Sequence, residues 1–157
     1  MIKITDKLLT ETSDKAGHAE RKRHNYNFHK DFDDPINRMI NAMEKGAYFP
    51  PHKHENPDKR EVFIIFKGRV LMVEFNDSGK VTDYIILDPE KGDMGVEIPP
   101  RTWHTLVPLE KVSVLYEIKD GPYDKNVDKT FAEWAPKEGE EGAKEFVDKI
   151  LMELNVA

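Results

Sequence analysis

Two histidines separated by one residue are the first feature of this sequence that could do chemistry. His52 and His54 directly follow Pro50 and Pro51. Side chains at positions i and i+2 of an extended chain point to the same side, so one metal ion could accept both imidazoles. Imidazole suits Zn, Fe, Ni and Cu as a ligand. The pair therefore predicts a metal-binding site but does not identify the ion.

Two residues further along the chain could complete such a site. Glu61 opens a strongly β-prone segment, where a buried carboxylate needs an ion pair or a metal. His104 stands at the start of another predicted strand. Glu55 is a rival carboxylate, but it adjoins His54 and would point away on a regular strand. Without a metal, Glu61 could instead pair with a neighbouring cation: Lys59, Arg60 or Arg69.

The elements that must position these residues are short strands. Between residues 23 and 120, β-prone runs alternate with turn residues at roughly ten-residue spacing, which is typical of an antiparallel sandwich or barrel. The turn Gly68-Arg69 predicts a hairpin between strands 61–67 and 70–75. The other expected strands cover 23–29, 38–43, 81–87, 96–98, 102–107 and 112–119.

Helices are expected at the two ends of the chain. Thr5 is a plausible cap for a short helix that reaches about Ala16. Residues 140–154 predict an amphipathic helix that packs on the barrel or on a partner subunit. The 157 residues suit one domain, 1–157, with a β core at about 23–120 and a C-terminal extension at 121–157.

Composition excludes several classes of protein. A formal net charge of −6 disfavours nucleic-acid binding. The absence of cysteine excludes disulfides, thiolate metal sites and cysteine nucleophiles. The longest apolar run, Val62 to Phe66, has five residues and is too short to span a membrane. The N-terminus lacks a signal-peptide pattern, so we expect a cytoplasmic protein.

The spacing of the possible ligands resembles the two signature motifs of the cupin superfamily. The first motif corresponds to Gly46, His52, His54, Glu61 and Gly68. In the second motif Pro99 and His104 match, whereas Arg101 stands in the place of a glycine and Pro108 in that of an asparagine. Six residues separate His54 from Glu61, where three or four are usual. The longer gap contains Asn56-Pro57-Asp58, which predicts a turn that loops out.

Residues 3–137 are also similar to the WbuC family of cupin-fold metalloproteins. The matching stretches are 23–29, 38–39, 51–54, 59–63, 96–104 and 116–123. This resemblance implies an all-β cupin barrel, a double-stranded β-helix or jelly roll, with a short N-terminal and an amphipathic C-terminal helix. It implies one divalent transition metal (Fe, Mn, Ni or Zn) on His52, His54, Glu61 and His104. It also implies a bacterial cytoplasmic protein of surface-polysaccharide (O-antigen, lipopolysaccharide) biosynthesis.

Three histidines and one glutamate would leave two positions of an octahedral ion open to a substrate. Such an ion can act as a Lewis acid and as a template. We therefore expect a metal-dependent isomerase or epimerase acting on a small sugar-related molecule. An Fe(II)-dependent dioxygenase and a non-catalytic sugar-binding or sensor cupin are the alternatives, because the fold alone does not choose a reaction. The candidates for proton transfer are Tyr48, Glu117 and Lys119.

Substrate recognition has candidates close to the ligands in sequence. Arg60 and Arg101 could bind a carboxylate or phosphate, and Trp103 could contact the face of a sugar. Surface ion pairs and core packing explain the same residues equally well. The expected partners are a sugar-derived small molecule and a second copy of the chain in a homodimer, with no nucleic acid and no membrane.

The faces of two strands carry further expectations. Glu61, Phe63 and Ile65 share one face, so an inward Glu61 would make the adjoining cavity wall apolar. Arg23, Asn25, Asn27 and His29 form a polar row. We expect this row to be solvated or in a subunit contact rather than at the mouth of the barrel.

Overall fold

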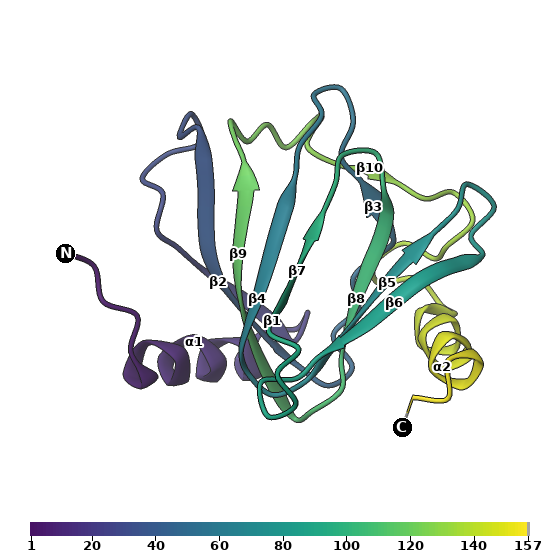
Figure 1. The fold of residues 1–157 in the computed structure, drawn as a ribbon, viewed down its shortest axis with the longest axis horizontal. Helices are drawn as coiled ribbons and strands as arrows, with labels where there is room; N and C mark the ends of the chain where they lie inside the picture. Colours follow the sequence, from purple (N-terminus) through teal and green to yellow (C-terminus); the bar gives the residue numbers. More distant parts are fainter. Residues whose placement is uncertain (157) are drawn as a thin grey trace.

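A computed structural model describes residues 1–156 and shows two antiparallel five-stranded sheets facing each other (Figure 1). Sheet A contains β1 (Arg23–Asn27), β2 (Ile36–Glu44), β9 (Val112–Asp120), β4 (Glu61–Lys67) and β7 (Gly95–Ile98), in that spatial order. Sheet B contains β10 (Thr130–Phe131), β3 (His52–Lys53), β8 (Trp103–Pro108), β5 (Val70–Phe75) and β6 (Val81–Leu87). The all-β jelly-roll core predicted from the sequence is confirmed.

One helix covers the outer face of each sheet (Figure 1). Helix α1 (Asp6–His18) lies on sheet A, and the Thr5 side chain caps it by accepting a hydrogen bond from the Leu8 amide at 3.4 Å. Helix α2 (Ala143–Glu153) lies on sheet B. Its predicted apolar face packs there through Phe146, Val147, Ile150 and Leu151, joined by Leu154 just beyond the helix. Both terminal helices were predicted correctly.

Within residues 1–156, no helix has the length and apolar content that crossing a membrane requires.

The interior between the sheets changes character from one end to the other. At one end Met43, Ile65 and Leu115 belong to a buried apolar core. Towards the other end of the same strands lie Asn37 and Lys119, which are paired in register on β2 and β9. Lys119 is in turn paired with Glu61 of β4. The sheet register therefore gathers the polar inward side chains at one end of the barrel.

The predicted hairpin at Gly68 is wrong. Strands β4 and β5 belong to different sheets, and Gly68, at φ +73°, turns the chain from one sheet into the other. Strand β5 is apolar on both faces: Met72 faces the inner core, while Leu71 lies under α2. A strand of this kind needs cover on both faces, which the core between the sheets and α2 supply.

Replacing Gly68 by alanine is expected to lower the free energy of unfolding by about 2–4 kcal/mol, because a left-handed residue and a steric clash are imposed together. A methyl group at this position would collide with the Val112 carbonyl oxygen and lie 2.7 Å from the Ser113 hydroxyl. Gly92 is a matched control, since its φ is +89° but no atom lies within 4 Å of the added methyl. Gly92→Ala should cost about 1 kcal/mol. Equal losses for the two variants in urea denaturation would contradict this account.

Candidate metal centre and cavity

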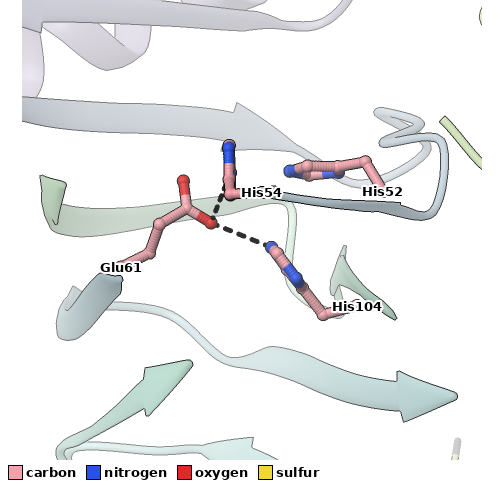
Figure 2. A group of neighbouring side chains, drawn as sticks. All are labelled: His52, His54, Glu61 and His104. Atoms are coloured by element: carbon pink, nitrogen blue, oxygen red, sulfur yellow. Dashed lines mark ion pairs between the residues drawn. The ribbon is translucent and has the colours of Figure 1, made fainter. Parts of the chain in front are cut away.

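Figure 2 shows the four predicted ligands converging inside the barrel. His52 lies on β3, directly opposite His104 of β8 in the register, and His54 follows β3. Glu61 begins β4 after a turn that contains the extra residues of the motif gap, as expected. The four side chains are 1% to 4% exposed, and one ligand atom of each lies within 4.8 Å of all the others.

Main-chain carbonyl groups hold the three imidazole rings in place. The Nδ1 atoms contact these oxygens: His52 at Pro50 (3.0 Å), His104 at Thr102 (2.9 Å) and His54 at Asp128. A carbonyl oxygen only accepts hydrogen bonds, so each Nδ1 must carry the proton. The Nε2 atoms therefore present lone pairs to the centre of the cluster.

The converging atoms fit a divalent transition metal. The three Nε2 atoms and Glu61 Oε2 are buried and make no hydrogen bond within residues 1–156. Glu61 Oε2 lies 3.1 Å from His54 Nε2 and 2.9 Å from His104 Nε2. Neighbouring ligands on an octahedral ion with bonds of about 2.1 Å are separated by about 3.0 Å. One ion would satisfy all four atoms at once, which a single proton would not.

Charge at the cluster also favours a metal. Burial lowers the pKa of His52 well below its ordinary value, so this ring is a neutral ligand at pH 7. Burial alone would raise the pKa of Glu61, but the adjacent His104 and His54 rings outweigh it and hold that pKa well below its ordinary value. Glu61 is therefore the anionic member of the ligand set.

Arg101 occupies the place where the second cupin motif has glycine. Its φ is +66°, a left-handed conformation that glycine adopts without cost. The Arg101 amide donates a hydrogen bond to the His54 carbonyl at 2.9 Å. The departure from the motif therefore preserves its backbone conformation and helps to hold the segment that carries His54.

A cavity of about 840 Å³ borders the metal centre at His52 and Glu61. The inner face of sheet A forms one wall, on which Phe63 supplies the apolar surface predicted for β4. Leu106 and Phe131 of sheet B also line the cavity. The neighbouring strands make the sheet A wall strongly polar through Asn37, Asn41, Glu117 and Lys119.

Lys119, on the cavity wall, is held as a cation by a buried network. Its Nζ lies 2.6 Å from Asp128 Oδ2, and the Lys59 Nζ lies 2.8 Å from Asp128 Oδ1. Burial opposes the charge of Lys119, but Glu117, Glu61 and Asp128 raise its pKa above the ordinary value. Because the Asp128 carbonyl also holds the His54 ring, this network fixes a metal ligand as well as Lys119.

Glu117 has the properties of a group that exchanges protons. It is 7% exposed, lines the cavity, and its Oε2 accepts a hydrogen bond from Asn41 Nδ2 at 3.1 Å. Burial and the charge of Glu61 raise its pKa above the ordinary carboxyl value. A carboxyl group with a raised pKa takes up a proton more readily than an ordinary exposed carboxylate does, which suits a group that transfers protons.

Tyr48, the third candidate for proton transfer, lies elsewhere. Its hydroxyl donates a hydrogen bond to the Pro136 carbonyl at 2.7 Å, and its ring packs on Phe146 of α2. Burial raises the pKa of Tyr48 to about 12. Tyr48 is not among the described residues that line the cavity.

The structure does not bring the three recognition candidates to the cavity. They contact aspartates instead: Arg60 with Asp120 at 3.2 Å, Arg101 with Asp58 at 2.8 Å, and Trp103 with Asp77 at 2.9 Å. Arg60 and Trp103 each adjoin an inward-pointing ligand in sequence. Neighbouring strand residues face opposite sides, so alternation alone places both outside the barrel.

Other residues line the cavity in their place. The predicted polar row, which comprises β1 residues Arg23, Asn25 and Asn27 and the following His29, lines the cavity, whereas we expected it in solvent or in a subunit contact. Asn37 and Asn41 were missed, although their alternation on β2 offered a signal. Lys129 was missed as well, and its irregular surroundings offered none.

Comparisons with known proteins agree with this fold. A family model described as "Domain of unknown function (DUF6016)" matches residues 4–87. No curated protein matches the sequence significantly. Capsular polysaccharide assembling protein CapF from Staphylococcus aureus is a similar structure, with 18% identity and a TM-score of 0.57 over 71% of this chain and 31% of CapF. A recombinant oxalate oxidase in complex with glycolate has 14% identity and a TM-score of 0.54 over 72% of this chain and 56% of the oxidase.

The chain therefore spans about a third of CapF and just over half of the oxidase. At these identities the likeness shows the fold, which is the cupin barrel. Combined with the buried cluster of three histidines and one glutamate, the fold indicates a metal-binding cupin.

Proposed function

The chain belongs to the family described as a domain of unknown function (DUF6016), and we propose that it is a metal-dependent isomerase or epimerase of a small sugar-related molecule. One observation carries the proposal: the ligands His52 and Glu61 share a cavity with Glu117, a buried carboxyl group suited to proton transfer. The proposal includes kinship with the WbuC proteins and a cytoplasmic role in surface-polysaccharide synthesis. The fold likeness to a capsular polysaccharide assembling protein supports that setting.

A divalent ion held by His52, His54, Glu61 and His104 would supply Lewis-acid polarisation of a substrate carbonyl group. Glu117 removes the proton from the carbon next to that carbonyl and returns it to the former carbonyl carbon. The proton of the adjacent hydroxyl group passes to the former carbonyl oxygen, which completes the isomerisation. Its Oε2 is engaged by Asn41, so Oε1 is the atom that exchanges the proton. Lys119 faces the same cavity as a fixed cation and stabilises negative charge that develops on the substrate.

Aromatic rings at the cavity supply the apolar contacts that a sugar face requires. Phe131 is 53% exposed, lines the cavity, and its ring centroid lies 6.1 Å from that of His52. Phe32 and Tyr123 also line the cavity, with their centroids 5.2 Å apart. These rings take the role that the sequence analysis assigned to Trp103.

Glu117→Gln is expected to reduce solvent proton exchange into the substrate at least about 100-fold while leaving the metal content unchanged. The amide keeps the size of the side chain but cannot take up the proton. The measurement follows the C–H signals of fructose 6-phosphate, mannose 6-phosphate and glucuronate by NMR in D₂O with the metal-loaded protein. Absence of exchange in the wild type, or full exchange in the variant, would refute the proposed reaction.

The same ligand set also suits an Fe(II)-dependent dioxygenase, because a carboxylate beside three imidazoles is compatible with Fe(II). Oxygen consumption by the Fe(II)-loaded protein would identify that activity, whereas an isomerase is indifferent to oxygen. Binding of a sugar without product would identify a sensor or binding module. The proposal also includes a homodimer, which light scattering of the purified protein tests.

A further inference from the structure

Lys129 lines the cavity but has no counter-ion in contact. It forms no hydrogen bond and no ion pair within 4.0 Å in the described chain. Of the other four cations that line the cavity, Lys119 pairs with Asp128, and Arg21 and Arg23 pair with Glu138. The fourth, Lys137, is exposed to solvent. The Lys129 side chain is half-buried, and burial lowers its pKa. An ammonium group that is partly removed from water and has no counter-ion in contact favours the binding of an anion.

Two buried amide side chains on the same wall also have unused hydrogen-bonding atoms. Asn37 is 1% exposed and its Nδ2 has no acceptor, while Asn41 is 4% exposed and its Oδ1 has no donor. Both line the cavity from β2. Asn37 therefore needs an oxygen acceptor and Asn41 needs a hydroxyl donor, and a hydroxylated ligand provides both.

The residues that line the cavity have an excess of positive charge, whereas the whole chain has a net negative charge. The chain carries a net charge of −6. The cavity is lined by five lysines or arginines and three glutamates, one of which is the ligand Glu61. A basic cavity in an acidic protein concentrates anions at the metal centre.

We infer that the cavity binds a small hydroxylated anion, a sugar acid or a sugar phosphate. Its carboxylate or phosphate pairs with Lys129, and its hydroxyl groups bind Asn37 and Asn41. This inference rests on the proposed function only in treating that anion as the substrate. Binding itself requires no turnover.

Calorimetric titration of the metal-loaded protein tests the inference with three probes: glucuronate, glucose 6-phosphate and glucose. At least one anion should bind ten-fold or more tightly than glucose, and which anion does so distinguishes a carboxylate from a phosphate. Lys129→Met should weaken binding of that anion at least ten-fold. Lys125→Met makes the same change of net charge at an exposed loop residue outside the cavity, and should bind as the wild type does.

The Tm and the metal content of Lys129→Met show whether this variant still folds. Methionine keeps the unbranched shape of Lys129 and removes an unpaired charge, so Tm and metal content should not fall. Lys129→Arg should retain the preference for anions. A lower Tm together with lost binding would identify a structural lysine and overturn the inference. Unchanged anion binding by Lys129→Met, glucose binding as tightly as both anions, or no anion binding at millimolar concentration would also overturn it.

These outcomes are separable from those of the proposed reaction. Anion binding that depends on Lys129, without any proton exchange, would leave the inference standing and remove the isomerase. Turnover of a neutral sugar at an unchanged rate in Lys129→Met would support the isomerase and contradict the inference that an anion binds at Lys129.

Discussion

Replacing His52 by alanine is expected to lower the metal content from about one ion per chain to a small fraction of that value. His52 is paired with His104 across β3 and β8, and it also lines the cavity. Loss of an outer hydrogen-bond partner already costs 10- to 100-fold in metal affinity in typical sites, so loss of a direct ligand should cost more than about 100-fold. Plasma mass spectrometry of the untagged protein measures the effect.

The natural control is His24→Ala. His24 also lines the cavity, but it is not part of the ligand cluster, so this variant should retain its metal. A chelator should lower the Tm of the wild type and of His24→Ala, because an ion bound only by the folded state stabilises it. The same chelator should leave the Tm of His52→Ala unchanged. Full metal occupancy in His52→Ala, or no bound metal in the wild type after reconstitution with Fe, Mn, Ni or Zn, would contradict the assignment of this cluster as a metal centre.

Asp128→Asn is expected to lower the free energy of unfolding by about 3–5 kcal/mol, because it leaves two buried ammonium groups without their shared carboxylate. Asp128, Lys59 and Lys119 are 2% to 4% exposed. The segment that carries the Asp128 carbonyl also holds the His54 ring, so metal affinity should fall about 10- to 100-fold. Urea denaturation and metal titration measure the two effects separately.

The stabilisation by Asp128 also has a defined pH dependence. Burial opposes its ionisation, but the Lys119 and Lys59 partners lower its pKa below the ordinary 3.8. A carboxyl group with a lowered pKa in the folded state stabilises the protein at pH values above the unfolded pKa. That stabilisation disappears as the pH falls below about 4 and through the lower folded value. The difference in the free energy of unfolding between the wild type and Asp128→Asn should therefore become smaller in acid.

The exposed pair of Asp120 and Arg60 is the matched control for this prediction. Their side chains are 41% and 61% exposed, so Asp120→Asn should cost less than about 1 kcal/mol at pH 7. A loss of similar size in both variants would show that the buried network contributes no more than a surface ion pair.

Local patterns in the sequence predicted most of the strands, both helices and the residues of the candidate metal centre. Period-two alternation placed Glu61 and Phe63 on one face of a strand, and the structure has both facing the interior. Spacing and the motif resemblance predicted the four residues that the structure brings together in the buried cluster. This succeeded because a strand dictates locally which side chains share a face.

Only the tertiary structure decided what each face meets. Gly68 predicted a turn in either case, but the cover that β5 requires on both faces placed β4 and β5 in different sheets. Lys129 and Asp128 lie in an irregular segment with no periodicity to orient their side chains. Their positions follow from the pairing of β10 with β3 and, for Asp128, from ion pairs with Lys59 and Lys119, which are distant in the sequence. Long-range contacts of this kind leave no pattern in a single sequence.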